Sequence, residues 1–151
     1  MNVVREPLDQ LATCGLPQAL EVMGERWSFL ILRAAFNGLV HFEEFSEQLG
    51  IARNILSGRL AKLVRNGVME RIRSDQDRRK VEYRLTEKGL DLLPAMLALR
   101  QWGERYGTGV ASNPVLVDAK NRQPIAPITI RAADGRELKR GDLAWKVCGE
   151  D

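Results

Sequence analysis

The sequence predicts a mainly helical α+β fold, and three features of its hydrophobic pattern support that prediction. Between residues 17 and 66, apolar residues recur at three- and four-residue spacing, as they do on the buried faces of helices. Between residues 68 and 85 the pattern changes to alternation, which is typical of an antiparallel hairpin. After Thr86 the helical spacing returns. The predicted order is therefore a group of helices, a hairpin and a further helix.

The first two helices are predicted on either side of Gly24. Pro17 can open a helix at its first position, where the backbone N–H has no partner inside the helix, and Gly24 interrupts the helix. A second, buried helix covers residues 27–37, and Gly38 supplies a left-handed residue at its end. The apolar positions of these two helices are Ala19, Leu20, Met23, Trp27, Leu30, Ile31, Ala34 and Ala35.

The next two helices form a helix-turn-helix pattern. After a brief extended link at residues 39–41, a short helix ends at Gly50, and a longer helix covers residues 52–66 before Gly67. A short helix, a tight turn containing glycine and a longer basic helix are the parts of this motif. The expected buried positions are Phe42, Phe45, Leu49, Leu56, Leu60, Leu63 and Val64.

Positive charge is concentrated in the same part of the chain. Residues 51–84 hold ten Lys and Arg against four Asp and Glu, whereas residues 1–50 hold three against seven. A basic stretch is often only a solvated face, so the element that carries it decides its meaning. Here it includes the longer helix, whose polar face lies opposite the leucines and suits the major groove of DNA. The candidate DNA contacts on this helix are Arg53, Asn54, Ser57, Gly58, Arg59, Lys62 and Arg65.

Within that helix, the first turn and a half carries the residues expected to reach base edges, namely Arg53, Asn54 and Ser57. Gly58 lowers helix propensity by about 1 kcal/mol, so a close approach of the backbone to another surface would explain its presence. A tolerated surface glycine is the alternative.

The hairpin is predicted from Val68 and Ile72 on one side and from Val81, Tyr83 and Leu85 on the other. Its tip carries three consecutive cations, as expected of a wing that enters the minor groove or contacts phosphates. Two acidic residues in the same loop would either neutralise the tip or cap the turn, and a merely solvated loop is the alternative. The three candidate DNA contacts are Arg78, Arg79 and Lys80, and the two acidic residues are Asp75 and Asp77.

One long helix is predicted after the hairpin. Thr86 is placed as its N-cap, Glu87 lies in the first turn, and Pro94 is expected to bend it. Its apolar arc is wider than a lone surface helix needs, which indicates a subunit interface, although burial against the first two helices would explain many of the same residues. The candidate interface residues are Leu93, Leu97 and Trp102.

The remaining residues predict a second, smaller part. Residues 1–107 would form the DNA-binding and dimerisation domain, and residues 108–151 a β-rich extension. The extension is predicted from a linker rich in glycine and polar residues, two short apolar runs at residues 115–117 and 128–130, and a turn at Asp134 and Gly135. Its role is left open between supporting a dimer, binding an effector and holding a partner.

The composition disfavours several classes of protein. The sequence has no glycine-rich phosphate loop and no recognisable group of carboxylates, so an enzyme is not expected and no cofactor is predicted. Cys14, Cys148 and His41 are a poor set of metal ligands, so no metal site is expected. No apolar run approaches the ~20 residues of a membrane span, and the chain is expected to be cytoplasmic.

Many spaced positions between about residues 10 and 107 resemble the HxlR family of bacterial regulators, relatives of the MarR group. The resemblance is carried by Cys14-Gly-Leu-Pro, Gly24-Glu-Arg-Trp27, Gly38, Phe42, Gly50-Ile-Ala-Arg-Asn-Ile-Leu-Ser-Gly-Arg-Leu60, Gly67, Val81-Glu-Tyr-Arg-Leu-Thr86, Gly89 and Trp102. It implies a winged helix-turn-helix fold and a homodimer on a two-fold symmetric operator. Cys14 matches a cysteine that senses oxidants or electrophiles in several family members.

These observations together predict a homodimeric regulator that binds double-stranded DNA and responds to an oxidant or a small molecule. An inert, buried role for Cys14 remains open, since free cysteine is among the most often buried residues. Two further alternatives also remain: a winged-helix adaptor that binds proteins instead of DNA, and a regulator that senses a non-covalent ligand.

Overall fold

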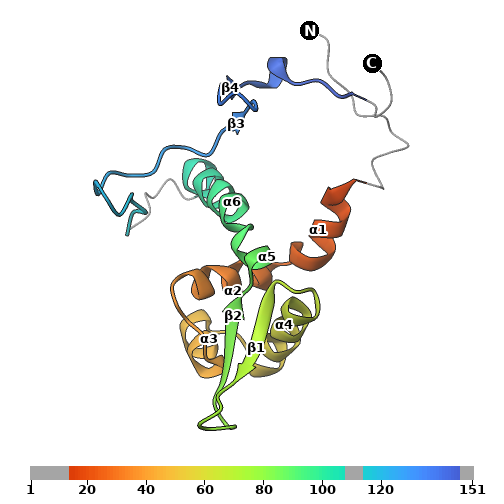
Figure 1. The fold of residues 1–151 in the computed structure, drawn as a ribbon, viewed down its shortest axis with the longest axis vertical. Helices are drawn as coiled ribbons and strands as arrows, with labels where there is room; N and C mark the ends of the chain where they lie inside the picture. The colour runs from red at the N-terminus through yellow and green to blue at the C-terminus, as the bar shows by residue number, and fades with distance from the viewer. Residues whose placement is uncertain (1–13, 108–113, 147–151) are drawn as a thin grey trace. The chain divides into compact units, whose positions relative to one another are not determined.

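The computed structural model describes residues 14–107 and 114–146, which fall into two compact units. One unit is Gly15–Met96, and the other contains Cys14 and the described residues from Leu97 onward. Figure 1 shows a helical group with a two-stranded hairpin in the first unit, and part of a helix with two short strands in the second.

The first two helices are confirmed. Helix α1 is Gly15–Met23 and α2 is Arg26–Phe36, with Gly24 and Glu25 between them. Glu25 is the N-cap of α2, and its carboxylate accepts hydrogen bonds from the backbone N–H groups of Trp27 and Ser28. These bonds satisfy donors in the first turn that have no partner inside the helix.

The helix-turn-helix is confirmed as well. Helix α3 is Phe42–Leu49 and α4 is Arg53–Arg65, and Gly50 between them has a left-handed φ of 60°. Apolar side chains of α2, α3 and α4 meet the start of the hairpin in one core. The fully buried members of that core are Ile31, Leu32, Phe45, Leu56, Leu60, Leu63, Val68 and Met69.

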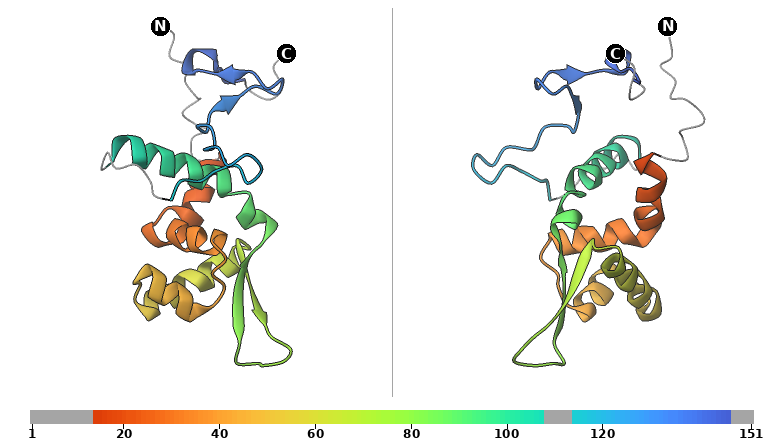
Figure 2. Two further views of the ribbon diagram at one scale, coloured as in Figure 1. Left: turned by 90° about the vertical axis from the view of Figure 1, so that its left-hand side faces the viewer. Right: turned by 45° about the vertical axis from the view of Figure 1, so that its right-hand side comes forward.

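The predicted hairpin is formed by β1, Met69–Arg73, and β2, Val81–Leu85, which pair in antiparallel register from Met69 opposite Leu85 to Arg73 opposite Val81. Figure 2 shows its tip projecting away from the helices of the same unit. The link before α3 joins the other edge of β2, where the N–H of Tyr83 donates to the carbonyl of Val40 at 2.7 Å. The hairpin is thereby fixed to the start of the helix-turn-helix.

The prediction of one long helix after the hairpin is wrong. The structure has a short helix α5, Glu87–Leu90, and a separate helix α6, Leu93–Tyr106. Pro94 is the reason, since proline has no N–H for a helix interior but is tolerated in a first turn, where α6 places it. The capping prediction is confirmed, because the Thr86 hydroxyl accepts from the N–H of Gly89 at 3.2 Å. A Cβ at Gly89 would lie 2.2 Å from the carbonyl oxygen of Val68, so this position requires glycine.

The described C-terminal residues contain a short antiparallel strand pair, which encloses the predicted turn at Asp134 and Gly135. Strands β3, Ile130–Arg131, and β4, Glu137–Leu138, form an antiparallel pair around a turn at Gly135, and a 3-10 helix η2 follows at Arg140–Asp142. The run at residues 115–117 forms only one bridge, between Val117 and Pro124. The predicted linker residues Gly109, Ser112 and Asn113, and also Cys148, lie outside the described residues.

The side chain of Gln101 on α6 binds this segment at two points. Its Nε2 donates to the carbonyl of Ala126 at 3.3 Å, and its Oε1 accepts from the N–H of Ile128 at 2.7 Å. The amide of Gln101 thus forms the two hydrogen bonds that a neighbouring strand would otherwise form with these backbone groups. Among the described residues, no helix is long and apolar enough to cross a bilayer.

Candidate nucleic-acid interface

The start of α3 is fixed by Glu44. Its Oε2 accepts hydrogen bonds from the N–H groups of Val40 at 3.0 Å and His41 at 2.9 Å. The bonds from His41 and Val40 lower the pKa of the Glu44 carboxyl. The ring Nδ1 of His41 lies 3.3 Å from the carbonyl oxygen of Val81, on the strand that leads from the tip of the hairpin. The helix-turn-helix and the wing therefore share this anchoring point.

Arg53, a candidate DNA contact, lies at the start of α4 and pairs with α3. Its Nη1 is 2.6 Å from Oε2 of Glu43, and its guanidinium lies over the ring of Phe42 at 4.8 Å. The hydrogen bond from Arg53 lowers the pKa of Glu43. Both side chains of the pair are 65% exposed, so the pair adds little stability and a DNA phosphate can compete with Glu43 for the guanidinium.

The outer face of α4 is open to solvent. Asn54, Ser57, Gly58 and Arg65 are exposed, and Lys62 is half-buried. Beyond its chain neighbours and the backbone of its own helix, no atom of the described residues lies within 4 Å of the point where a Cβ of Gly58 would be, so packing in the described part of the chain does not explain this glycine. The side chains of Asn54 and Ser57 next to it are short, so the N-terminal half of this face leaves room for another surface to approach the helix.

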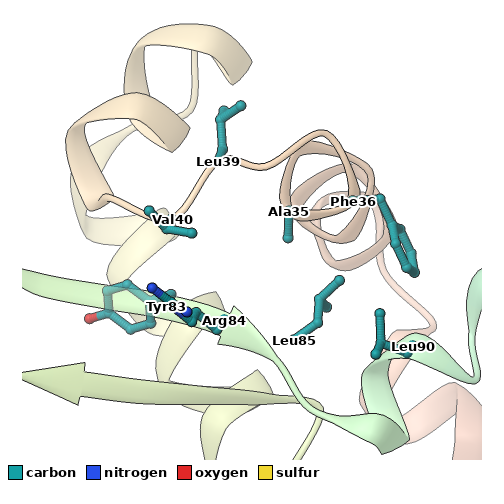
Figure 3. Close-up of a pocket in the computed structure, with 8 residues that line it drawn as sticks. All are labelled: Ala35, Phe36, Leu39, Val40, Tyr83, Arg84, Leu85 and Leu90. Carbon is teal, nitrogen blue, oxygen red and sulfur yellow. The ribbon is translucent and has the colours of Figure 1, made fainter.

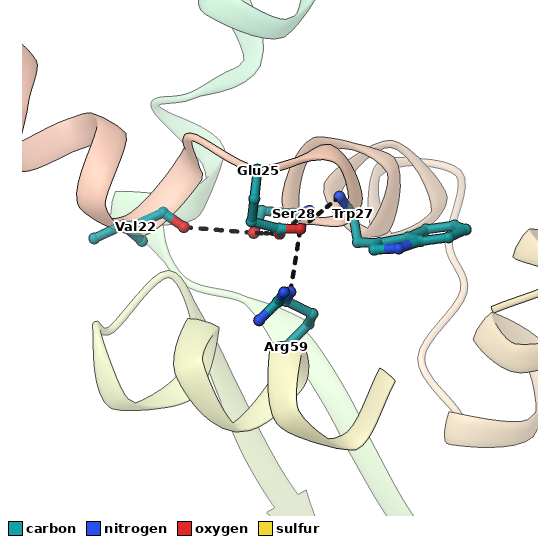
Figure 4. Close-up of polar contacts among 5 residues, drawn as sticks. All are labelled: Val22, Glu25, Trp27, Ser28 and Arg59. Carbon is teal, nitrogen blue, oxygen red and sulfur yellow. Dashed lines mark hydrogen bonds and ion pairs between the residues drawn. The ribbon is translucent and has the colours of Figure 1, made fainter. Parts of the chain in front are cut away.

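Arg59, also expected to contact DNA, instead faces the junction of α1 and α2. Its Nε lies 3.1 Å from Oε2 of Glu25, and Figure 4 shows the guanidinium directed at that carboxylate. Local sequence patterns do not predict this pair, because the two residues lie 34 positions apart.

The wing tip presents three unpaired cations. Arg78, Arg79 and Lys80 are exposed, and none of their side chains pairs with an acidic group in the described part of the chain. Asp77 is occupied with the turn, since its Oδ1 accepts from the N–H of Arg79 at 3.0 Å and its carbonyl accepts from the N–H of Lys80. Asp77 therefore caps the turn, which is one of the two predictions for the acidic residues.

A small pocket lies at the base of the wing, between the end of α2, the link to α3, β2 and α5 (Figure 3). Its volume is about 270 Å³, and most of its lining is apolar, including Phe36, Leu39 and Leu90. Arg84 is its cationic lining residue, and that guanidinium pairs with Glu82 at 2.6 Å. Ligand pockets usually exceed ~300 Å³ and offer polar groups that orient a ligand, so we assign no effector to this one.

The candidate interface residues differ in exposure. Leu97 is 9% exposed within a single chain, Leu93 is half-buried, and Trp102 is 64% exposed. Leu99 and Tyr106 are also exposed on α6, at helical spacing from Trp102, and the rings of Trp102 and Tyr106 lie 5.8 Å apart. An exposed apolar stripe, formed by Leu99, Trp102 and Tyr106, therefore runs along α6.

Cys14 is half-buried and directly precedes α1. No group of three His, Cys, Asp or Glu residues suited to a metal ion occurs in the described parts of the chain.

The family model for the HxlR-like helix-turn-helix matches residues 22–110, which include α2, the helix-turn-helix, the wing and α6. The chain belongs to the HxlR-like helix-turn-helix family. It is 48% identical over 89 residues to an uncharacterized HTH-type transcriptional regulator of Mycobacterium tuberculosis, a match that covers 59% of this chain and 56% of the relative. The chain thus spans little more than half the length of that relative. The regulator YdeP of Bacillus subtilis is 34% identical over 65% of this chain and 77% of its own length.

Solved structures extend the similarity to the C-terminal part. The crystal structure of PA1607, described as a candidate transcription factor, is 40% identical and superposes with a TM-score of 0.82 over 95% of this chain and 100% of that chain. The redox regulator HypR in its reduced form is 31% identical, with a TM-score of 0.57 over 61% of this chain and 92% of its own. Reduced YodB of B. subtilis is 28% identical, with a TM-score of 0.55 over 64% of this chain and 95% of its own.

Proposed function

We propose that this protein is a sequence-specific, DNA-binding transcription regulator that acts as a homodimer, and not an enzyme. The proposal depends on the combination of two features of the same unit: an exposed polar face on α4, and three cations at the wing tip that pair with no acidic group among the described residues. A helix face with short polar side chains in its N-terminal half fits the major groove, and exposed cations supply phosphate contacts. Relatives named as transcriptional regulators support the same function.

In this proposal, α4 enters the major groove with its N-terminal part. Asn54 and Ser57 are short, exposed and polar, so they are suited to donate and accept hydrogen bonds at base edges. Arg53 exchanges its ion pair with Glu43 for a DNA phosphate. Lys62 and Arg65, farther along the helix, lie near the DNA backbone. The wing contacts the adjacent minor groove or its phosphates.

Asn54→Ala and Ser57→Ala test whether these two side chains contact base edges. Duplexes selected by the wild-type protein from a random pool serve as preferred sites. Each variant is expected to lose ~1–3 kcal/mol of discrimination at one base pair, while its affinity for random duplexes stays within about twofold. Competition binding against a panel of single-base changes measures both quantities. An equal loss of affinity for all sequences would place the residue on the DNA backbone.

The main rival function is a winged-helix adaptor that binds a protein. If the wild-type protein bound no duplex from the pool, or bound DNA with no dependence on salt, the proposal would fail in favour of the adaptor, because phosphate contacts release counterions.

An oxidant or electrophile response through Cys14 is a second part of the proposal. It is supported by the similarity to HypR, solved in reduced and oxidized forms, and to YodB, solved in reduced, diamide-treated and quinone-bound forms. Cys14 is half-buried and directly precedes α1, so part of its side chain is accessible to a reagent.

Treatment with a quinone or a mild oxidant is therefore expected to lower affinity for a selected duplex in the wild type and in Cys148→Ser, while Cys14→Ser keeps its affinity. Mass spectrometry of the treated protein identifies the modified cysteine. Loss of DNA binding in Cys14→Ser under the same treatment, or full binding by wild type with Cys14 modified, would contradict the sensing role.

A further inference from the structure

The junction between α1 and α2 holds a carboxylate with an unusual number of partners. Glu25 accepts from the N–H of Trp27 at 2.9 Å, from the N–H of Ser28 at 2.7 Å, and from the hydroxyl of Ser28. Ser28 is 1% exposed, and its hydroxyl also lies 3.4 Å from the carbonyl oxygen of Val22 at the end of α1. The position of the Glu25 carboxylate is therefore fixed by Trp27 and Ser28 in the first turn of α2 (Figure 4).

Arg59 joins α4 to this fixed carboxylate. Its Nε is buried, lies 3.1 Å from Oε2 of Glu25, and donates no hydrogen bond to a described group, so the contact is an ion pair. Burial raises the pKa of Glu25, but the hydrogen bonds from Ser28 and Trp27 and the charge of Arg59 outweigh burial and lower it. Glu25 thus stays charged at neutral pH opposite the guanidinium.

The helical position of Arg59 explains why it turns inward. It comes three residues after Leu56 and four before Leu63, so it lies beside the buried stripe of α4 and not in the middle of the exposed face. Its side chain is 37% exposed, whereas Asn54, Ser57 and Gly58 belong to the open surface. Arg59 thus differs from Arg53: its acidic partner Glu25 is half-buried, whereas Glu43, the partner of Arg53, is exposed.

We propose that Glu25 and Arg59 are a positioning pair, which holds α4 at the angle to α2 that sequence-specific DNA binding requires, and that Arg59 acts through Glu25 and makes no phosphate contact. This inference rests on the proposed function. The leucines of α4 supply non-directional packing, which tolerates small rotations and shifts of the helix. A charged contact to a fixed carboxylate on the neighbouring helices removes that freedom.

The positioning pair and a phosphate contact make opposite predictions for Glu25→Gln. The amide oxygen of glutamine can still accept from Ser28, whereas its NH2 group cannot accept from the N–H of Trp27. This change therefore removes the charge and one of the hydrogen bonds that cap α2. If Arg59 were a phosphate contact held back by Glu25, the variant would release it, and affinity for random DNA would rise. If the pair positions α4, affinity for selected sites falls while affinity for random DNA does not.

The test measures, for each variant, the ratio of affinities for a duplex selected by the wild type and for a random duplex of equal length, across a series of salt concentrations. Glu25→Gln and Arg59→Met are each expected to lower this ratio about tenfold. The double variant should be no worse than either single variant, because both remove the same interaction. The salt slope should stay at its wild-type value in all three.

A control variant and the second single variant distinguish loss of the pair from a general effect of charge or of stability. Asp134→Asn removes one carboxylate charge and the ion pair with Arg136 in the other unit, outside α4 and α6, and should leave the ratio unchanged. Arg59→Met keeps the cap of α2 intact, so it tests the pair even if Glu25→Gln proves less stable in thermal unfolding.

A salt slope lower by about one unit in Arg59→Met would identify a phosphate contact and overturn the positioning role. Unchanged ratios in both single variants would overturn it too, while leaving DNA binding intact. Absence of salt-dependent DNA binding by the wild type would instead refute the proposed function itself.

Discussion

Replacing Arg78 and Arg79 together by alanine is expected to weaken binding to every DNA sequence by roughly fiftyfold near 0.1 M salt. Both side chains are exposed at the wing tip and pair with no acidic group among the described residues, so their full charge is available to phosphates. Each phosphate contact contributes about 0.9 to the slope of log affinity against log salt. The slope should therefore become shallower by nearly two units.

The measurement is a salt series with a selected duplex and a random duplex of the same length. A matched double variant, Lys120→Ala with Lys139→Ala, removes two exposed cations from the C-terminal unit and should leave both slopes unchanged. Equal slopes for the wing variant and the wild type would show that the wing does not contact DNA.

Local signals explain why the helix-turn-helix and the hairpin could be predicted from the sequence. Gly38, Gly50 and Gly67 all have positive φ, a conformation that glycine adopts without a steric penalty, and each ends a helix. The change from helical to alternating spacing after Gly67 marks the start of the wing. Such signals need only the residues within a few positions of the feature they predict.

Two features of the fold were beyond this kind of prediction. The sequence predicts that Pro94 bends one helix, but whether proline bends a helix or begins a new one depends on the packing of the residues before it. In the C-terminal part, the apolar runs were identified, but their pairing depends on contacts such as those of Gln101, which lies 25 positions before Ala126.

The candidate site shows the same limit. An exposed cation and an inward-facing cation are identical in sequence, and only the fold brings Glu25 to Arg59 and Glu43 to Arg53. The one sequence signal for the first pair was Glu25 itself, an acidic residue between Gly24 and the start of a helix, where a capping carboxylate is favoured. That signal predicts the cap of α2 but not its partner on α4.

The exposed stripe of α6 leads to the prediction with the largest effect on operator binding. Leu99, Trp102 and Tyr106 are 55%, 64% and 62% exposed in the single chain. Large contiguous apolar surface is uncommon on monomers and indicates an interaction site, and a second copy of α6 would cover this stripe in a symmetric dimer. Leu97 is already buried within one chain, so its replacement would test folding as well as assembly.

Trp102→Asp is the sharper variant, because its side chain is exposed in the monomer and a carboxylate there becomes costly only when a second copy covers it. Light scattering at micromolar concentration should give twice the chain mass for the wild type and the chain mass for this variant. Two half-sites about 34 Å apart require two linked copies of α4, so affinity for a two-fold symmetric duplex should fall by about a thousandfold, toward that for random DNA.

Trp145→Asp is the control. It makes the same change at a tryptophan that is 60% exposed outside α6, and it should remain a dimer. If Trp145→Asp became monomeric while Trp102→Asp stayed dimeric, the subunit interface would lie in the C-terminal β-rich part and not on α6.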